Sequence, residues 1–247
     1  MSANSAASVR NLSAVSVRHL VRKFSGRTVL DGLDLEVAAG EFVALLGRSG
    51  SGKSTLLRAL AGLDGGAAGS GEVRVPEKLS IVFQDARLLP WRRVLQNVEL
   101  GLPGPDARRR AVGALAEVNL SGRERAWPGD LSGGEQQRAA LARSLVRDPE
   151  LLLADEPFSA LDTLTRTHMH TLLRRLCARH RPAVLLVTHD VDEAIALADR
   201  IIVLRAGRIC STLSVERPAD PRERDAYATH VRAALVSELG PAESRIA

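Results

Sequence analysis

The chain has 247 residues, of which 45% are hydrophobic and 3% aromatic, and this length accommodates one large domain with an aliphatic core. Its longest apolar stretches, residues 183–187 and 201–204, fall far short of the ~18 residues that a membrane-spanning helix needs. The formal net charge is +5, but the arginines are dispersed, which favours a solvated surface, acidic lipid or a membrane partner over nucleic acid. Residues 1–13 read as a loose tail without the apolar block of a secretory signal, so we expect a cytosolic chain whose membrane role, if any, comes through a partner.

The patterns before residue 84 are mostly those of strands. Strands are expected over residues 14–21, 29–37, 41–46, 72–75 and 79–83. The third of these runs into a glycine-rich loop, and a helix over residues 53–61 follows the loop.

Helical patterns dominate from about residue 85 to residue 146, where prolines and glycines separate expected helices at residues 94–102, 107–118 and 134–145. This segment indicates a helical subdomain inserted into an α/β core. The core then resumes with alternating strands and helices, expected at residues 151–154, 163–179, 183–187, 191–198 and 201–204. Such alternation is typical of a parallel sheet covered by helices on both faces.

Two features of the C-terminal part carry no catalytic signal. The main domain is expected to span residues 14–216, and residues 217–247 form a C-terminal extension that turns helical at about residues 226–239. Cys177 and Cys210 lack the spacing of a metal site, so we expect inert, buried thiols in a reducing compartment.

The glycine-rich loop matches the pattern G-x-x-x-x-G-K-S over residues 47–54. Glycines let the backbone fold tightly around an anion with N–H groups pointing inward, and the following helix adds its positive end. Lys53 is a compact, flexible charge that reaches the β- and γ-phosphates, and Ser54 offers a hydroxyl to Mg²⁺. The candidate nucleotide-binding residues of this loop are Gly47, Arg48, Ser49, Gly50, Ser51, Gly52, Lys53, Ser54 and Thr55.

An apolar strand ends in two carboxylates, Asp155 and Glu156. If this strand lies beside the glycine-rich loop, Asp155 reaches the metal directly or through water. Glu156 is then placed to orient or deprotonate an attacking water. Alone, the same pattern fits an ordinary strand end with solvated acids, but beside an intact phosphate loop the catalytic interpretation is favoured.

Residues 131–138, Leu-Ser-Gly-Gly-Glu-Gln-Gln-Arg, are a second candidate for phosphate binding. Ser132 and Glu135 have the spacing of a capping box, which predicts the start of a helix. Gly133 and Gly134 leave the N–H groups of that start free of side chains, so a phosphate from another molecule could approach closely. The residues alone leave open whether this helix start binds a phosphate or is only capped.

This octet resembles the signature motif of ABC-type ATPases, and the other motifs of that family follow in order over about residues 15–215. The glycine-rich loop resembles the Walker A motif, and residues 151–156 resemble Walker B with its catalytic glutamate. Residues 83–85 resemble the Q-loop, residues 159–162 the D-loop and residues 187–190 the switch-histidine segment. The resemblance implies an α/β P-loop NTPase with a mostly parallel sheet core, an antiparallel β subdomain and the inserted helical subdomain.

The resemblance also implies a homodimer that encloses two ATP molecules. Each ATP would lie between the phosphate loop of one chain and Ser132, Gly133, Gly134 and Asp162 of the other. The family often stacks adenine on a tyrosine where this chain has Phe24, and a phenyl ring stacks as well.

Further roles that the resemblance implies concern the metal and the γ-phosphate. Gln84 would join Ser54 and Asp155 near Mg²⁺ and couple the site to a membrane subunit, and His189 would contact the γ-phosphate. Glu135 stands where the family often has glutamine, and we leave it out of the site. The expected catalytic residues are Lys53, Gln84, Glu156 and His189.

For partners, the resemblance implies integral membrane permease subunits, which would contact residues 84–91, and an extracytoplasmic solute-binding protein. The chain would then be peripheral, on the cytoplasmic face of the cell membrane. Leu-Leu-Pro-Trp at residues 88–91 resembles importers of nitrate, taurine and aliphatic sulfonates, with the sulfonate importers nearest. Alternatively, Trp91 is a buried side chain that plugs the helical subdomain.

Other functions stay open as alternatives. Taurine, nitrate or a pyrimidine precursor could be the solute, because the solute contacts other chains. A soluble, non-transport ABC ATPase is less favoured, because such proteins usually carry long insertions or two ATPase units. A GTPase is disfavoured, because no Asn-Lys-x-Asp motif occurs.

Overall fold

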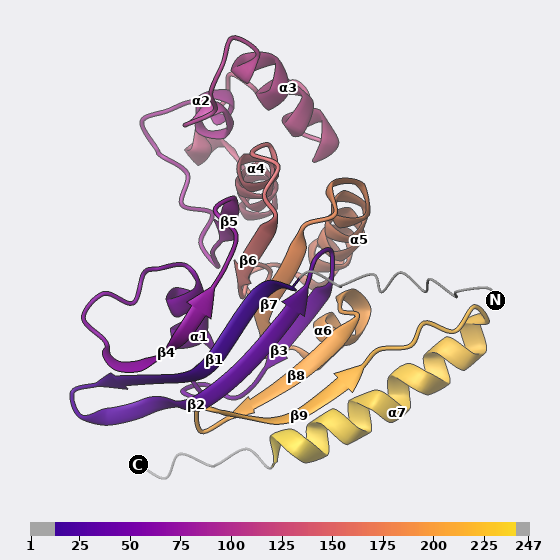
Figure 1. Cartoon of the computed structure of the whole chain (residues 1–247). Coiled ribbons are helices and arrows are strands. Elements are labelled where there is room, and N and C mark those ends of the chain that lie inside the picture. Colours follow the sequence, from indigo (N-terminus) through magenta and orange to yellow (C-terminus); the bar gives the residue numbers. More distant parts are fainter. Residues whose placement is uncertain (1–12, 241–247) are drawn as a thin grey trace, which may run out of the picture.

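The N-terminal strands form a small antiparallel sheet. In the computed structural model, which describes residues 13–240, this sheet has the order β2-β1-β4 (Figure 1). Its strands are β1 (Ser13–Phe24), β2 (Arg27–Ala38) and β4 (Ala68–Arg74). The expected tail at residues 1–13 lies outside the described residues except for Ser13, as do the last seven residues of the C-terminal extension.

A second, six-stranded sheet carries the candidate site, in the order β5-β6-β7-β3-β8-β9. Its strands are β3 (Phe42–Leu46), β5 (Leu79–Val82), β6 (Leu151–Asp155), β7 (Ala183–Thr188), β8 (Arg200–Arg205) and β9 (Arg208–Ser214). Neighbours from β5 to β8 pair in parallel, and only β9 runs antiparallel to its neighbour. The expected α/β fold with a mostly parallel core is therefore confirmed.

Both faces of this sheet are buried, and β3 shows why its strands read as continuous apolar runs. Val43 and Leu45 face α1 and the antiparallel sheet, whereas Phe42, Ala44 and Leu46 belong to a core shared with the helices of the other side. A strand buried on both faces gains from apolar residues at every position, which is the pattern seen in parallel sheets.

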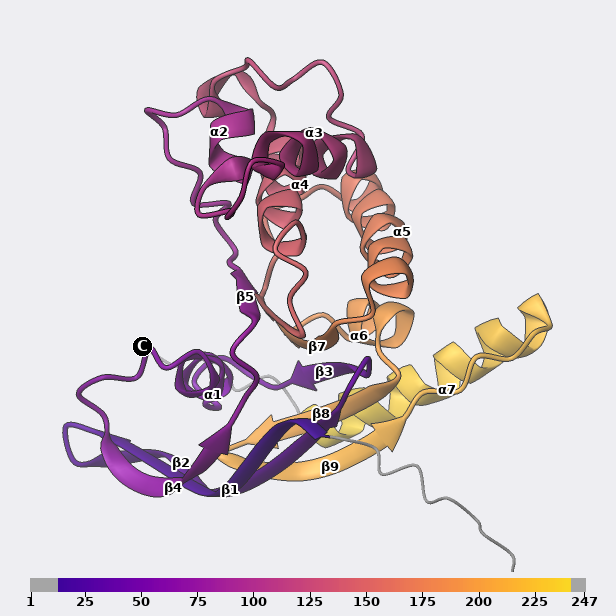
Figure 2. The same cartoon turned by 45° about the horizontal axis from the view of Figure 1, so that its top comes forward.

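Helices connect the strands and cover the sheet. They are α1 (Lys53–Leu60), α2 (Val94–Glu99), α3 (Ala107–Glu117), α4 (Gly133–Leu145), α5 (Thr163–His180), α6 (Val191–Leu197) and α7 (Pro221–Leu239), with a 3₁₀ turn at Pro128–Asp130. Figures 1 and 2 show α2 and α3 at the end of the molecule farthest from the antiparallel sheet. Across residues 13–240, no helix is both long enough and apolar enough to cross a membrane.

The structure differs from the sequence expectations near the C-terminus. Sequence patterns gave no range for β9, because its residues are alternately exposed and half-buried and it follows a turn at Ala206 and Gly207, with φ 49° and 78°. Two consecutive positive φ angles fit a type I′ hairpin turn, but Ala-Gly is a weaker signal for it than Asn-Gly. Helix α7 begins at Pro221 rather than near residue 226, because Asp220 caps it by accepting a bond from the N–H of Arg222 at 2.7 Å.

The expectation of two buried thiols is wrong for one of them. Cys210 lies on the edge strand β9 and is exposed, whereas Cys177 is half-buried on α5. Burial, with the charge of Asp199 adding to it, raises the pKa of the Cys177 thiol to about 12.

Candidate functional site

The loop between β3 and α1 folds so tightly that two of its glycines have no room for a side chain. A Cβ on Gly47 would lie 2.5 Å from the carbonyl oxygen of Leu204, and one on Gly52 would lie 2.8 Å from a methyl carbon of Leu30. Gly52 also has φ 108°, which other residues rarely adopt. The glycines of the motif are therefore required by the fold itself, before any ligand is considered.

Lys53, the first residue of α1, is held inside this loop. Its Nζ donates to the carbonyl oxygens of Gly47 at 2.7 Å and Arg48 at 3.1 Å, and the residue is only 6% exposed. Burial lowers the pKa of Lys53, while the nearby charges of Glu156 and Asp155 act in the opposite direction. The ammonium is thus already positioned by the loop, at the place where an anion would be bound.

Asp155 ends β6 beside the loop, as the sequence predicted. Ser54 Oγ donates to Asp155 Oδ1 at 3.5 Å, and burial, followed by the charge of Glu156, raises the pKa of Asp155. Hydroxyl and carboxylate oxygens are the kind of ligand that Mg²⁺ prefers, so this donor set fits the expected cation. Gln84, the third expected ligand, is exposed and lies two residues after the end of β5.

Glu156 and His189 meet at the mouth of the loop. His189 Nδ1 lies 3.0 Å from Glu156 Oε2, so the two side chains that the sequence assigned to catalysis are within hydrogen-bond distance. Glu156 has φ 45°, a left-handed conformation that costs free energy in a residue with a side chain. Next to His189, Asp190 caps α6 and pairs with Arg166 of α5 at 3.0 Å, which fixes the loop that carries the histidine.

These groups surround a pocket of about 510 Å³. It is lined by Val29, Ser49, Gly50, Gly52, Lys53, Ser54, Thr55, Glu156 and His189. Val29 could not be predicted from the sequence, because an apolar residue on a strand gives no functional signal.

Several predicted nucleotide-binding residues lie apart from that pocket: Gly47, Arg48 and Ser51 of the loop, and Phe24. Gly47 and Ser51 are in the buried part of the loop, where the N–H of Gly207 donates to the carbonyl oxygen of Ser51 at 3.0 Å. Phe24 is 40% exposed at the end of β1 and does not line the pocket. Its open ring is free to be covered by a flat ligand group.

The signature residues lie outside this pocket as well. Ser132 caps α4: its Oγ accepts from the N–H of Glu135 at 3.3 Å, and Glu135 Oε2 accepts from the N–H of Ser132 at 2.9 Å. The predicted capping box is therefore present, and the hydrogen bond from the Ser132 N–H leads the causes that lower the pKa of Glu135. Asp162 caps α5 in the same way, accepting from the N–H of Thr165 at 3.0 Å.

The two signature glycines differ in their surroundings. A Cβ on Gly133 would meet nothing within 4 Å, whereas a Cβ on Gly134 would lie 2.8 Å from Thr165 Cγ2. Gly133 is exposed, and Gly134 is buried against the start of α5. The motif thus has one glycine that leaves an open surface and one that allows two helices to pack closely.

The segment from Gln84 to Trp91 presents an aromatic surface. Trp91 is 71% exposed, so the alternative of a buried plug is wrong. The turn that displays it is built around Asn97, which is fully buried and donates to the carbonyl oxygens of Leu89 at 3.2 Å and Arg92 at 3.0 Å. An exposed indole on a turn held this firmly is suited to contact another protein.

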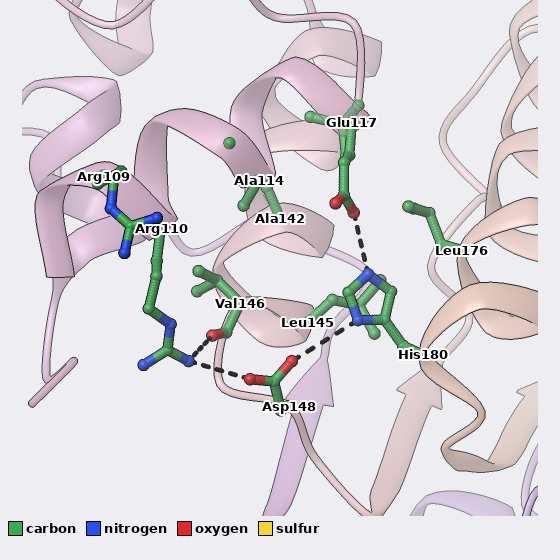
Figure 3. A pocket seen from close by; sticks show the side chains of 12 residues that line it. Arg109, Arg110, Ala114, Glu117, Ala142, Leu145, Val146, Asp148, Leu176 and His180 are labelled. Carbon is green, nitrogen blue, oxygen red and sulfur yellow. Dashed lines mark hydrogen bonds and ion pairs between the residues drawn. The ribbon is translucent and has the colours of Figure 1, made fainter. Parts of the chain in front are cut away.

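A separate cavity of about 280 Å³ lies where α3 and α4 meet α5 (Figure 3). Its charged rim is internally paired: His180 Nε2 lies 2.9 Å from Glu117 Oε2, and Arg110 Nη2 lies 3.1 Å from Asp148 Oδ2. The charges are satisfied by one another, so the cavity is interpreted as a joint between the helical segment and the core.

Comparisons with known proteins agree with this geometry. The family model described as "ABC transporter" matches residues 30–159. The aliphatic sulfonates import ATP-binding protein of Streptomyces avermitilis is 65% identical over 93% of this chain and 92% of that protein. The protein of the same description from Nocardia farcinica is 66% identical over 92% of this chain and 94% of that protein.

Two solved structures are also similar to this chain. One is a dimeric ATP-binding cassette in a post-hydrolysis state bound to ADP and Pi, with 32% identity and a TM-score of 0.72 over 83% of this chain and 100% of that one. The other is CbiO1 from Clostridium perfringens, part of the ABC transporter complex CbiONQ, with 26% identity and a TM-score of 0.76 over 90% of this chain and 94% of that one. The family resemblance and the fold inferred from the motifs are both confirmed.

Proposed function

Because the chain belongs to the ABC transporter family, we propose that it is the ATP-hydrolysing subunit of an importer for aliphatic sulfonates. The ATPase part rests on the pocket that the phosphate loop, Glu156 and His189 line, and on Asp155, which is hydrogen-bonded to Ser54 of that loop. The solute rests on the descriptions of relatives that share about two thirds of their residues with this chain over nearly its whole length.

The loop and Lys53 bind the triphosphate. Backbone N–H groups of the loop and the positive end of α1 attract the β- and γ-phosphates, and Lys53 exchanges its loop carbonyls for phosphate oxygens. Ser54, Asp155 and Gln84 would hold Mg²⁺, which when bound neutralises charge on the phosphates. Burial and the charge of Glu156 raise the pKa of Asp155, so a cation beside this carboxylate would stabilise its charged form.

Hydrolysis is an in-line attack of water on the γ-phosphorus. Glu156 accepts a proton from that water while the water oxygen forms a bond to the γ-phosphorus. The bond between this phosphorus and the bridging oxygen of ADP breaks, so ADP and inorganic phosphate leave. His189, 3.0 Å from Glu156, orients this carboxylate and reaches the γ-phosphate. The left-handed backbone of Glu156 aims its side chain toward the pocket rather than along the strand direction.

A second copy of the chain completes the site. Ser132, Gly133, Gly134 and Asp162 lie outside the pocket of their own chain, and Ser132 and Gly133 are exposed. A face-to-face homodimer brings them onto the partner's γ-phosphate, with the positive end of α4 pointing at the anion. A dimeric cassette among the similar structures supports this arrangement.

Transport requires membrane permease subunits, which dock on the surface around Gln84 and Trp91. The exposed indole of Trp91 supports this placement, because a large aromatic anchor is typical of protein interfaces. The ATPase would then be held on the cytoplasmic face of the membrane, with an extracytoplasmic solute-binding protein delivering the solute. Closure of the dimer on ATP and its opening after hydrolysis would drive the permease.

The solute is tested by copurifying the chain with its permease and measuring uptake in vesicles with the binding protein present. We expect ATP-dependent uptake of linear alkanesulfonates, with no comparable uptake of taurine, nitrate or pyrimidine precursors. Uptake of one of those solutes in place of alkanesulfonates contradicts the solute. Failure to copurify with any membrane subunit favours a soluble ABC ATPase instead.

A further inference from the structure

Helix α4 is hydrogen-bonded to the segment that carries Gln84, although the residues that start the helix, Ser132 to Gly134, do not line the pocket described above. Gln137 Nε2 donates to the carbonyl oxygen of Phe83 at 2.9 Å. Six residues further along the helix, Arg143 donates through Nη2 to Ala86 and through Nη1 to Arg87, both at 2.8 Å to carbonyl oxygens. The segment from residue 83 to residue 87 is therefore bonded to α4 at both ends, as its position beside α4 after β5 allows (Figure 2).

The Arg143 contact is the strongest of these bonds. A guanidinium that donates to two carbonyls makes charge-assisted bonds in a fixed fork geometry. Burial lowers the pKa of Arg143, with the charge of Arg147 adding to the shift, and no salt bridge within residues 13–240 involves Arg143. The half-buried guanidinium of Arg143 thus bonds to the backbone carbonyls of this one turn.

The turn that Arg143 holds is strained and would not keep its shape alone. Arg87 has φ 46°, which a residue with a side chain adopts only when its surroundings impose it. The Arg87 guanidinium lies 3.7 Å from the centre of the Phe83 ring, so the turn closes on itself across Gln84. The Gln84 side chain is exposed, and none of the hydrogen bonds found within residues 13–240 involves it. Its position therefore depends on the backbone on either side.

We propose that Arg143 is a positioning residue that places Gln84 at the metal side of the nucleotide and makes it move with α4. This inference rests on the proposed function and adds a link within one chain. The same helix presents Ser132 and Gly133 to the partner's nucleotide at its first turn and holds the Gln84 segment of its own site along its length. Nucleotide bound at one site thereby displaces Gln84 at the other.

The test compares Arg143→Gln with Arg147→Gln, a matched control two residues after the end of α4. Arg147 also donates to a carbonyl, that of Leu100 at 2.7 Å, but this carbonyl lies outside the Gln84 segment. The first measurement is the rate at which trypsin cleaves the native chain after Arg87, because the peptide bond cut there carries the carbonyl that Arg143 Nη1 binds. Arg143→Gln is expected to speed this cleavage at least tenfold, as about 1.4 kcal/mol of local stabilisation implies. Arg147→Gln is expected to leave the rate unchanged.

The second measurement is the Mg²⁺ concentration that half-saturates binding of a fluorescent ATP analogue. We expect Arg143→Gln to raise it about tenfold, the lower end of the effect of losing a residue that orients a metal ligand. Gln84→Ala should raise it similarly, and the double variant should match Gln84→Ala alone, because both changes remove the same interaction. Should Arg143→Gln not fold, Arg143→Lys, which keeps the charge but loses the fork, enters the same cycle.

Additive effects in the double variant, or an unchanged rate of cleavage after Arg87, would overturn the proposal, because Arg143 would then act only on general stability. Both measurements use the purified chain with nucleotide and Mg²⁺. Both are independent of the uptake assay. A wrong solute or a wrong permease would therefore change the result of the uptake assay but not the result of these two measurements.

Discussion

The two surfaces that would hold one ATP differ in how complete each is within a single chain. The phosphate-loop surface is enclosed: Lys53 is 6% exposed, and its ammonium is already bonded to two carbonyls of the loop. The signature surface is open: Ser132 and Gly133 are exposed, and their hydrogen bonds serve only to start α4. One surface is complete after folding, whereas we propose that the other becomes a binding site only when a second chain approaches.

This difference indicates where binding free energy is available for motion. A loop that is prearranged around its anion binds nucleotide with little rearrangement, so it anchors the ligand. In the proposed dimer, an open helix start would contribute only when the two chains close, so its contacts with the γ-phosphate would favour closure and would be lost after hydrolysis. On this proposal, the asymmetry between the two surfaces is what converts ATP binding into movement.

The largest effect is expected from Lys53→Ala, which removes the ammonium group from the phosphate loop. Turnover should fall by at least about 10³-fold, comparable to losing a preorganised charge-stabilising group, because the same ammonium serves binding and the transition state. The measurement is phosphate release together with binding of a fluorescent ATP analogue. Lys78→Ala, at an exposed lysine outside the pocket, is the matched control and should be indistinguishable from the parent. Normal turnover in Lys53→Ala would refute the role of the loop.

Glu156→Gln separates binding from cleavage. Turnover should fall by about 10²- to 10⁴-fold, the usual contribution of a general base, while both surfaces keep their contacts with ATP. The variant should therefore accumulate as an ATP-bound dimer, seen as a doubling of mass in light scattering with ATP but not with ADP. A protein that stays monomeric with ATP contradicts the sandwich and leaves the signature surface without a ligand.

The two signature glycines offer the sharpest test of the open surface. Gly133→Ala places a methyl group where nothing lies within 4 Å, so the free energy of unfolding should be unchanged or rise slightly. ATP-driven dimerisation should nevertheless weaken, because the methyl group lies at the surface that meets the partner's phosphate. Gly134→Ala instead presses on Thr165, 2.8 Å away, and should lower the free energy of unfolding by about 1–3 kcal/mol. The same loss of stability in both variants would show that Gly133 is also a packing residue.

The sequence was sufficient for the core of the fold because its strands are buried on both faces. Runs such as Leu151 to Ala154 must be apolar at every position, and that is easy to read. It was insufficient for β9, an edge strand whose alternate residues remain exposed, and for the first turn of α7, where Asp-Pro reads equally as a loop. Elements that bury little surface leave little trace in the sequence.

The site divides along the same line. Residues fixed by chemistry, such as Lys53, Asp155 and Glu156, could be named from spacing alone. Lys53 and Glu156 line one pocket, and Asp155 is hydrogen-bonded to Ser54, which lines the same pocket. Val29 and Arg143 could not be found, because the first acts through shape and the second through backbone carbonyls 56 and 57 residues away in sequence. Neither property is encoded in a local motif.

A smaller effect on the protein itself is expected from Trp91→Ala, at the surface where we propose that the permease docks. Removing an indole that is 71% exposed should change the free energy of unfolding by no more than about 0.5 kcal/mol and leave basal hydrolysis intact. Uptake per ATP in reconstituted vesicles should nevertheless collapse. Asn97→Ala is the structural contrast: it removes the partner of the Leu89 N–H and of the Arg92 carbonyl in the same turn and should cost about 1–3 kcal/mol. Unchanged uptake in Trp91→Ala would move the permease contact elsewhere.

The smallest effect concerns the reactivity of the two thiols, which lie outside the site. Cys177 is half-buried and Cys210 is exposed, so they too compare an enclosed position with an open one. The thiolate is the reactive form, and a pKa of about 12 leaves Cys177 with roughly one thiolate in ten thousand at pH 8. Cys210 is exposed on β9, so a disulfide reagent should titrate one thiol per folded chain and two after unfolding. Cys210→Ser should abolish the fast phase and leave turnover unchanged. A fast phase that persists in Cys210→Ser would mean that α5 opens often enough to expose Cys177, and the core beneath the pocket would then be less rigid than its packing implies.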